Sequence, residues 1–263
     1  MTKSPKELAF LRDLYVDAEW TAKFTELADK HFGFTDDRSL LYRNAGTSNH
    51  VLAIAAKAHR DARITATCEN EHLLKIAADK AIATKSIVDF TGSEPEPDSF
   101  DAVIADASLV RPYDLADFAA RTASFAETGG TVALMTFAAG SFGEIFSLLW
   151  EAMMDDETAD LTLAERLITE LPTTSRFEEI LEASELESVE TKLANTTFDF
   201  ENGTAFVSSP LIADFLMPMW FDGMTEKQFE RVRDRLAQLI DAESEGLPFR
   251  FSVKTVLAIG EKR

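Results

Sequence analysis

The chain has 263 residues and carries 46 Asp and Glu against 26 Lys and Arg, which gives a formal net charge of −20 at pH 7. A hydrophobic content of 46% with only 11 glycines and 8 prolines excludes a disordered or fibrous protein and predicts a folded core. An acidic surface repels phosphate groups, so we expect no nucleic-acid partner and no binding to anionic membranes. The single cysteine, Cys68, excludes an internal disulfide and a cysteine metal cage.

Charges occur throughout the first twenty residues, so the apolar stretch of a signal peptide is missing there. No later apolar run approaches the roughly 20 residues that a membrane-spanning helix needs. The lone cysteine is also typical of a reducing compartment. These features together predict a cytoplasmic protein.

Helical spacing of apolar residues opens the chain, and residues 5–32 are predicted to form one or two helices that end at Gly33. The apolar positions of the first part are Leu8, Leu11, Leu14, Tyr15 and Ala18. A unit of strand, turn and helix then recurs. Strands are predicted at 39–42, 63–68, 86–90, 102–105 and 131–137, and helices at 51–58, 71–80 and 115–125.

Parallel neighbours in a sheet need a crossover connection, which is usually a helix, so this alternation predicts an α/β fold. We expect a Rossmann-like, doubly wound, mostly parallel sheet. Ligands of such sheets bind beyond the carboxyl ends of the strands, so the loops after the strands are the places to search for chemistry.

The second half of the chain has a different pattern, with long strands flanking helices. Helices are predicted at 142–154, 161–185, 211–221 and 226–240, and strands at 189–200 and 249–259. This pattern predicts an antiparallel edge and added cap helices. The expected organisation is N-terminal helices in 1–35, a βαβ core in 36–140, and cap helices with C-terminal strands of the same sheet in 141–263.

Two short motifs stand where the predicted fourth and fifth strands begin. Residues 98–104 read Asp-Ser-Phe-Asp-Ala-Val-Ile, and residues 127–131 read Glu-Thr-Gly-Gly-Thr. In this order they resemble the "D-x-S-F-D-x-V" and "x-P-G-G" motifs of class I S-adenosylmethionine (SAM) dependent methyltransferases of the small-molecule type. The resemblance covers residues 36–137 by motif and the remainder by layout, and it implies SAM as the cofactor.

The glycine-rich turn of that family, acid-x-Gly-x-Gly-x-Gly, falls on residues 42–48. Only Gly46 is kept, while Tyr42 stands at the acid and Asn44 and Ser48 stand at the outer glycines. Asn tolerates left-handed backbone and Ser is small, so the resemblance still implies cofactor contacts from this turn. A loop that only joins strand to helix is the open alternative.

The resemblance also implies a carboxylate at the end of the second strand that accepts hydrogen bonds from both ribose hydroxyls. We expect Glu69 in this role, although counting back from residues 73–74 places Cys68 there unless the loop is one residue shorter. The alternative is that Glu69 is a solvated charge. The acid that lies beside the adenine after the third strand cannot be assigned within 91–94.

Asp106 follows the fourth strand and is the candidate catalytic residue, as an acceptor-orienting group or a general base. A strand-end aspartate that caps the next loop is the alternative. The four histidines show no metal-ligand spacing, so no metal site is expected.

The sequence therefore predicts SAM-dependent methyl transfer to a small, partly apolar molecule that enters beneath the helices of 142–185 and 208–243. Methyl transfer is governed mainly by alignment, so the lack of an evident acid/base pair counts little against it. The changes at Tyr42, Asn44 and Ser48 leave open a fold without catalysis that acts as a binding or regulatory protein. A nicotinamide-dependent oxidoreductase is disfavoured because Gly-x-Gly-x-x-Gly is missing. The identity of the acceptor and the oligomeric state stay open.

Overall fold

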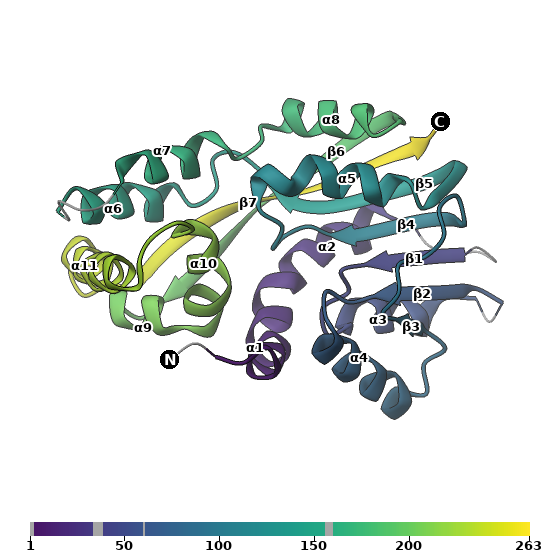
Figure 1. The fold of residues 1–263 in the computed structure, drawn as a ribbon, viewed down its shortest axis with the longest axis horizontal. Coiled ribbons are helices and arrows are strands. Elements are labelled where there is room, and N and C mark those ends of the chain that lie inside the picture. The colour runs from purple at the N-terminus through teal and green to yellow at the C-terminus, as the bar shows by residue number, and fades with distance from the viewer. Residues whose placement is uncertain (1–2, 34–38, 60, 156–159) are drawn as a thin grey trace. The chain divides into compact units, whose positions relative to one another are not determined.

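The computed structural model describes residues 3–33, 39–59, 61–155 and 160–263 and divides into two compact units (Figure 1). The first unit contains Met1–Thr136, Thr174–Leu193 and Thr255–Arg263, and the second contains Phe137–Thr173 and Ala194–Lys254. The predicted boundary at residue 35 lies outside the described residues. The three predicted regions stay a prediction.

A seven-stranded sheet organises the fold, with the strand order β3-β2-β1-β4-β5-β7-β6. Its strands are β1 (Ser39–Arg43), β2 (Arg63–Thr67), β3 (Asp89–Thr91), β4 (Phe100–Asp106), β5 (Ala126–Phe137), β6 (Leu186–Phe200) and β7 (Phe249–Lys262). Strands β1 to β5 pair in parallel, β7 is antiparallel, and helices flank the sheet. The predicted Rossmann-like fold with an antiparallel edge is confirmed, and it is the fold of class I SAM-dependent methyltransferases.

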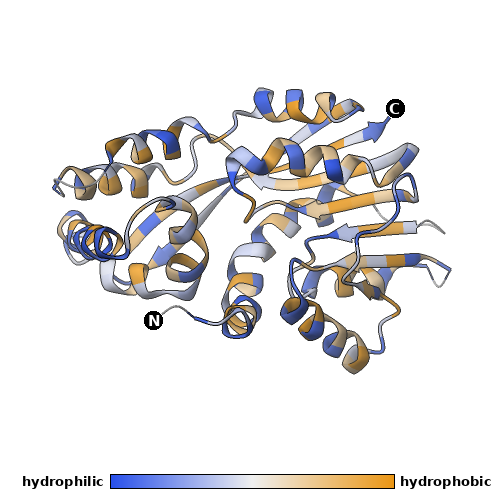
Figure 2. Ribbon diagram, in the orientation of Figure 1, coloured by the Kyte–Doolittle hydropathy of each residue, from blue (hydrophilic) through white to orange (hydrophobic). Residues whose placement is uncertain are grey.

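The central strands are apolar because helices cover both of their faces. Leu40, Leu41 and Tyr42 of β1 and Val103 and Ile104 of β4 are at most 1% exposed. Figure 2 shows apolar residues concentrated along these strands, whereas the helices alternate between apolar and charged positions. Among the described residues, no helix is both long and apolar enough to cross a membrane.

Helices of the first unit connect or precede these strands. They are α1 (Pro5–Leu11), the π-helix η1 (Arg12–Thr21), α2 (Ala22–His31), α3 (Asn49–Lys57), α4 (Glu71–Thr84), the 3₁₀ turn η2 (Pro112–Asp114), α5 (Leu115–Ala123) and α8 (Thr174–Ala183). Capping explains where α4 begins, because the Asn70 side chain accepts hydrogen bonds from the backbone N–H groups of His72 and Leu73.

The π-helix was not predicted. The apolar spacing in 5–32 indicates ordinary α-helix, yet the backbone N–H of Ala22 bonds to the carbonyl of Asp17, five residues earlier. This wider turn buries Arg12, Asp17 and Trp20 and leaves Leu14 64% exposed. π-Helical turns are rare and occur often at functional sites.

The fifth strand begins earlier than predicted, so the glycine pair expected before it lies within the strand. Strand β5 begins at Ala126, so Gly129 and Gly130 lie inside it. Gly129 has a φ of +80°, and a Cβ on Gly130 would lie 2.8 Å from the carbonyl oxygen of Glu127. The pairing of β4 with β5 shifts register at this point. The glycines therefore form a β-bulge and do not precede the strand.

The second unit is mainly helical. Its helices are α6 (Gly143–Met154), α7 (Leu161–Thr169), α9 (Gly203–Ser208), the π-helix η3 (Leu211–Leu216), α10 (Met217–Trp220) and α11 (Glu226–Ser244). Aromatic side chains form its core, with the Phe142 ring 5.4 Å from the Trp220 ring and 6.0 Å from the Phe251 ring between centroids. Phe206 packs edge-to-face on Phe249 at 5.3 Å. Such edge-to-face packing is a favoured geometry for aromatic rings.

Helices α9 and α11 approach closely at Gly203, where an added Cβ would lie 2.0 Å from the carbonyl oxygen of Ala237. We expect Gly203→Ala to lower the free energy of unfolding by about 3 kcal/mol or more, because the obstructing atom belongs to the backbone. Gly143→Ala is the matched control, since its Cβ would have no neighbour within 4 Å. Urea denaturation measures both. Equal stability of the two variants would contradict the close approach of the helices.

Candidate functional site

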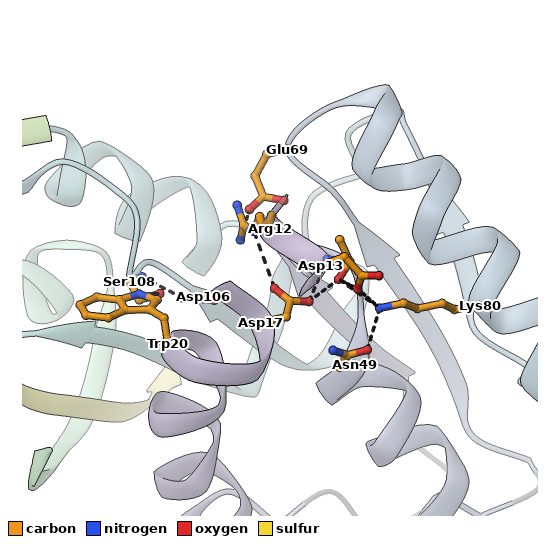
Figure 3. A network of polar contacts seen from close by, with 10 residues as sticks. Arg12, Asp13, Asp17, Trp20, Asn49, Glu69, Lys80, Asp106 and Ser108 are labelled. Carbon is orange, nitrogen blue, oxygen red and sulfur yellow. Dashed lines mark hydrogen bonds and ion pairs between the residues drawn. The ribbon is translucent and has the colours of Figure 1, made fainter. Parts of the chain in front are cut away.

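The carboxyl ends of β1, β2 and β4 lie side by side at one edge of the sheet, because β1 pairs in parallel with both neighbours. The loop after β1 carries Gly46 and Thr47, and the loop after β2 carries Glu69. Asp106 is the last residue of β4, and Ser108 lies in the loop after it. The fold thus brings the predicted turn, Glu69 and Asp106 to one edge. Figure 3 shows Glu69 and Asp106 with side chains of η1.

The turn after β1 contains three residues with left-handed backbone, of which only one is a glycine. Asn44, Gly46 and Ser48 have φ angles of +55°, +56° and +76°. All three lie in the left-handed region, which non-glycine residues seldom adopt and Asn tolerates best. Ser48 directly precedes α3. Asn44 and Ser48 thus adopt here a backbone that glycine adopts more readily.

Tyr42, which stands at the acid position of the resemblance, is buried and directs its hydroxyl to α3. The hydroxyl oxygen lies 2.8 Å from Nδ1 of His50, and the two rings pack edge-to-face at 5.5 Å. Nε2 of His50 lies 3.5 Å from a carboxylate oxygen of Asp29. Burial raises the pKa of Tyr42, and the nearby carboxylate of Asp106 acts in the same direction. Tyr42 is thus a neutral phenol bonded to α3.

Arg12, the first residue of η1, places a buried guanidinium at this edge of the sheet. Its Nη2 lies 2.6 Å from Oε1 of Glu69, and its Nε lies 3.8 Å from Oδ1 of Asp17. Burial would lower the pKa of Arg12, but the negative charges of Glu69, Asp106 and Asp17 outweigh it and the pKa is raised. Arg12 is therefore a fixed cation among three carboxylates.

The same guanidinium lies against the bare backbone of the turn. A Cβ on Gly46 would lie 3.1 Å from both Nε and Nη2 of Arg12, and 3.2 Å from Oδ1 of Asp17. At these distances no other atom fits between the turn and the side chains of Arg12 and Asp17. The face of Gly46 that a side chain would cover is thus filled by η1.

Further polar contacts attach η1 to the turn and to α4. Asp17 Oδ2 accepts a hydrogen bond from the backbone N–H of Thr47 at 3.2 Å and also contacts its hydroxyl. The Thr47 hydroxyl lies 2.7 Å from a carboxylate oxygen of Asp13, which pairs with Lys80. Lys80 Nζ donates to the side-chain oxygen of Asn49 at 2.7 Å. This network joins three elements around the turn.

The network leaves two buried atoms unsatisfied. Arg12 Nε and Asp17 Oδ1 have no hydrogen-bond partner among the residues that the structure describes. Burial raises the pKa of Asp17, although the charge of Arg12 opposes this. A buried polar atom without a hydrogen bond costs free energy, so the closed arrangement carries a penalty that a suitable polar ligand would remove.

Asp106 and Ser108 form the third attachment point of η1. Asp106 Oδ1 accepts a hydrogen bond from the backbone N–H of Ser108 at 2.8 Å, which is the loop-capping contact weighed from the sequence. The Ser108 hydroxyl in turn accepts a hydrogen bond from Nε1 of the buried Trp20 at 3.0 Å. Burial raises the pKa of Asp106 to about 6, against the opposing charge of Arg12 and the Ser108 hydrogen bonds.

Two remaining candidates lie outside this network. Cys68 has its pKa raised to about 12, mainly by burial, so it is a protonated thiol at neutral pH. Glu94, in the segment after β3, pairs with Arg121 at 2.6 Å. No group of three or more metal-ligating side chains occurs in the part of the chain that the structure describes.

Sequence reasoning missed the residues that η1 contributes, namely Arg12, Asp13, Asp17 and Trp20, together with their partner Lys80. The apolar pattern assigned Leu14 and Tyr15 to the same face as Leu8, whereas both are exposed in the structure. A possible signal was the spacing of five between Arg12 and Asp17, since residues five apart share a face of a π-helix but not of an α-helix.

Comparisons with known proteins support the fold. No family model and no curated protein matches the chain. The YcgJ protein of Bacillus subtilis matches with a TM-score of 0.61 and 15% identity over 92% of this chain and 99% of that one. A protein of Bacillus halodurans provisionally named a methyltransferase matches with a TM-score of 0.57 and 15% identity, over 92% and 97% of the two chains.

A third structure holds ligands. Phosphoethanolamine N-methyltransferase 2 of Haemonchus contortus, bound to phosphomonomethylethanolamine and S-adenosylhomocysteine (SAH), matches with a TM-score of 0.56 and 12% identity. The match covers 98% of this chain and 58% of that one. At these identities the likeness shows that the chain has the fold of small-molecule methyltransferases.

The side chains at this edge fit SAM in their chemistry. The left-handed turn allows a close approach to backbone N–H groups, and Glu69 supplies a carboxylate. The network of Figure 3 holds two cations, Arg12 and Lys80, against four carboxylates, so its surplus charge is negative and favours a cationic ligand. The space beside Gly46 is taken by η1 in this conformation.

The raised pKa of Asp106 predicts a pH-dependent stability. Between about pH 4 and pH 6 the folded state keeps the proton that an unfolded Asp106, with its ordinary pKa of 3.8, has already lost. Its contribution to stability therefore falls as pH rises through this window. Asp106→Asn removes that fall, so we expect the variant to match the wild type near pH 4 and to exceed its unfolding free energy at pH 7 by on the order of 2–3 kcal/mol.

Urea denaturation of wild type and variant across this pH range measures the difference. Asp89→Asn, at an exposed position of β3, is the control and should show no gain that grows with pH. If Asp106→Asn lowers the free energy of unfolding by the same amount at pH 7 and at pH 4, then ionising the buried carboxylate does not cost the expected free energy.

The left-handed turn predicts a gain in stability from glycine. Ser48→Gly should raise the free energy of unfolding by about 1 kcal/mol, because a left-handed φ costs a non-glycine residue roughly 1–2 kcal/mol, partly offset by the entropy of glycine. Ser48→Ala keeps the backbone cost and loses only the hydroxyl, so it should show no gain. If both variants change stability equally, the effect comes from the hydroxyl and the backbone argument fails.

Proposed function

We propose that the chain binds SAM at the carboxyl ends of β1 and β2 and transfers its methyl group to a small, partly apolar molecule. The observation that carries this proposal is the turn after β1, in which Asn44, Gly46 and Ser48 all have left-handed backbone, in a chain with the fold of small-molecule methyltransferases. A loop that served only to join strand to helix would have no need of three such residues.

Glu69 is proposed to hold the ribose hydroxyls of the cofactor, and the turn of residues 44–48 its methionine portion. Glu69 lies in the loop after β2, and its side chain keeps 24% of its surface exposed. An ionised carboxylate accepts hydrogen bonds at both oxygens, which matches two neighbouring hydroxyl donors. The negative surplus of the surrounding network favours the positive sulfonium of SAM.

SAM, when bound, would supply an electrophilic methyl group to an aligned nucleophile, with the S–CH3 bond breaking and the neutral thioether SAH as the leaving group. In this proposal Asp106 accepts the proton of an acceptor hydroxyl or ammonium group at its Oδ2 side, while Oδ1 stays bonded to Ser108. With a pKa of about 6 the carboxylate is mostly ionised at pH 7, which suits a general base. Its burial keeps water away from the reacting groups.

The acceptor is proposed to be a small molecule, with neither nucleic acid nor membrane as a partner. A net charge of −20 opposes the binding of polyphosphates. The proposed setting is the cytoplasm, for which the lone cysteine is the supporting feature.

A second candidate function is a methyltransferase fold without catalysis, acting in binding or regulation. The ion pair of Arg12 with Glu69 favours it, because the carboxylate proposed for the ribose is already engaged and Arg12 also covers Gly46. In this case the buried network would be a structural replacement for the cofactor.

Isothermal titration calorimetry with SAM and with SAH distinguishes the two functions. Methyl transfer predicts micromolar binding that Glu69→Ala weakens by about tenfold or more, because hydrogen bonds to a charged group contribute roughly 1.5–3 kcal/mol. Glu71→Ala is the matched control, with an exposed carboxylate two residues along the chain. Absence of binding by the wild type at millimolar SAM would contradict the enzyme and leave the second candidate.

A further inference from the structure

We infer that Arg12 is an internal competitor of SAM, so that the segment Arg12–Thr21 closes the site when the cofactor is absent and must move away when it binds. The inference rests on the proposed function, because it takes the SAM site to lie at residues 44–48 and Glu69. Beyond the proposed function, we infer that the guanidinium of Arg12 controls access to the SAM site.

One short segment contacts the loops after three different strands. Arg12 reaches Glu69 after β2, Asp17 reaches Thr47 after β1, and Trp20 reaches Ser108 after β4. All three contacts come from η1, which therefore lies across the carboxyl ends of the strands where ligands of this fold class bind (Figure 3). The position is that of a cover over the site.

Arg12 and the cofactor exclude each other for steric reasons. Guanidinium atoms 3.1 Å from the Cβ position of Gly46 are already in van der Waals contact with the turn. A ligand that uses the close approach to Gly46 would have to occupy the same volume. Nη2 of Arg12 also lies 2.6 Å from Oε1 of Glu69, in the place of a ribose hydroxyl.

The positive charge of Arg12 explains why SAM can replace the Arg12 guanidinium in the site. Arg12 is a cation that acts on Glu69, Asp106 and Asp17 together, and its departure alone would remove the positive charge that these three carboxylates share. SAM brings its own positive sulfonium and can take over this role. SAH carries no sulfonium charge, so it replaces Arg12 less well.

Two features make the closed state easy to open. Arg12 Nε and Asp17 Oδ1 are buried without hydrogen-bond partners among the described residues, so closure is incompletely satisfied. The segment is also a π-helix of ten residues, a conformation rarer and less regular than the α-helix. Both features reduce the free energy that SAM must supply to displace the segment.

The apparent affinity for any ligand of the site is the affinity of the open form multiplied by the fraction of molecules that are open, so closure weakens binding. If the segment is closed in about 90–99% of molecules, removing the competitor strengthens binding by about tenfold to a hundredfold. Since exclusion by volume does not depend on ligand charge, the gain applies to SAM and SAH alike.

The test is calorimetry of SAM and of SAH with the full-length wild type and with Arg12→Met, which keeps an apolar side chain but removes the charge and the guanidinium atoms that lie against Gly46 and Glu69. We expect both ligands to bind Arg12→Met at least about tenfold more tightly. Arg63→Met, at the exposed start of β2, is the matched control and should bind as the wild type does. The double variant Arg12→Met/Asp17→Asn removes both charges of the buried ion pair. It is used for the same titrations if the single variant does not fold.

The outcomes separate this inference from the proposed function. Binding to Arg12→Met that equals or is weaker than wild-type binding would overturn the inference and leave the cofactor site intact. A gain confined to SAM would also overturn it, since simple attraction to unpaired carboxylates explains that result. Binding by Arg12→Met with none by the wild type would support a locked site. No binding by either protein would overturn both proposals.

Discussion

A buried guanidinium needs carboxylate partners, and the ion pair of Arg12 with Glu69 is the interaction on which the rest of this site depends. It fixes the first residue of η1 over the turn after β1, and Asp17 and Trp20 then reach Thr47 and Ser108 from the same helix. The pKa of Asp106 is part of the same arrangement, because its carboxylate lies buried near this cation. Removing one charge would change the protonation and packing of the others.

The net charge of −20 has two parts with different roles. Most acids lie on exposed helix faces and loops, where they act as a solvated coat, and Figure 2 shows hydrophilic residues mainly outside the central strands. Asp13, Asp17, Glu69 and Asp106 instead meet around the turn, against Arg12 and Lys80. The local surplus of carboxylates is what makes this edge suited to a cationic ligand, and it is independent of the charge of the whole surface.

The doubly wound, mostly parallel sheet could be predicted because alternating strands and helices restrict the connections between neighbours. Left-handed backbone in the turn could be predicted from Asn44 and Gly46, since few residue types accept it, whereas the left-handed φ of Ser48 came only from the structure. The partners of Glu69 could not be predicted from the sequence. Arg12 lies far from it in the sequence, and a π-helix shifts side chains away from the faces that an α-helical pattern assigns. Leu14 was therefore expected inside but is exposed, and the burial of Arg12 was not foreseen.

The central claim is that SAM displaces η1 from the carboxyl ends of the strands. Hydrogen–deuterium exchange of the full chain, measured by mass spectrometry with and without saturating SAM, tests it most directly. The account predicts that peptides covering residues 12–21 exchange faster when SAM is present, while peptides covering 44–48 and 69 become protected. Greater protection of residues 12–21 on binding, or no change there while 44–48 becomes protected, would contradict it.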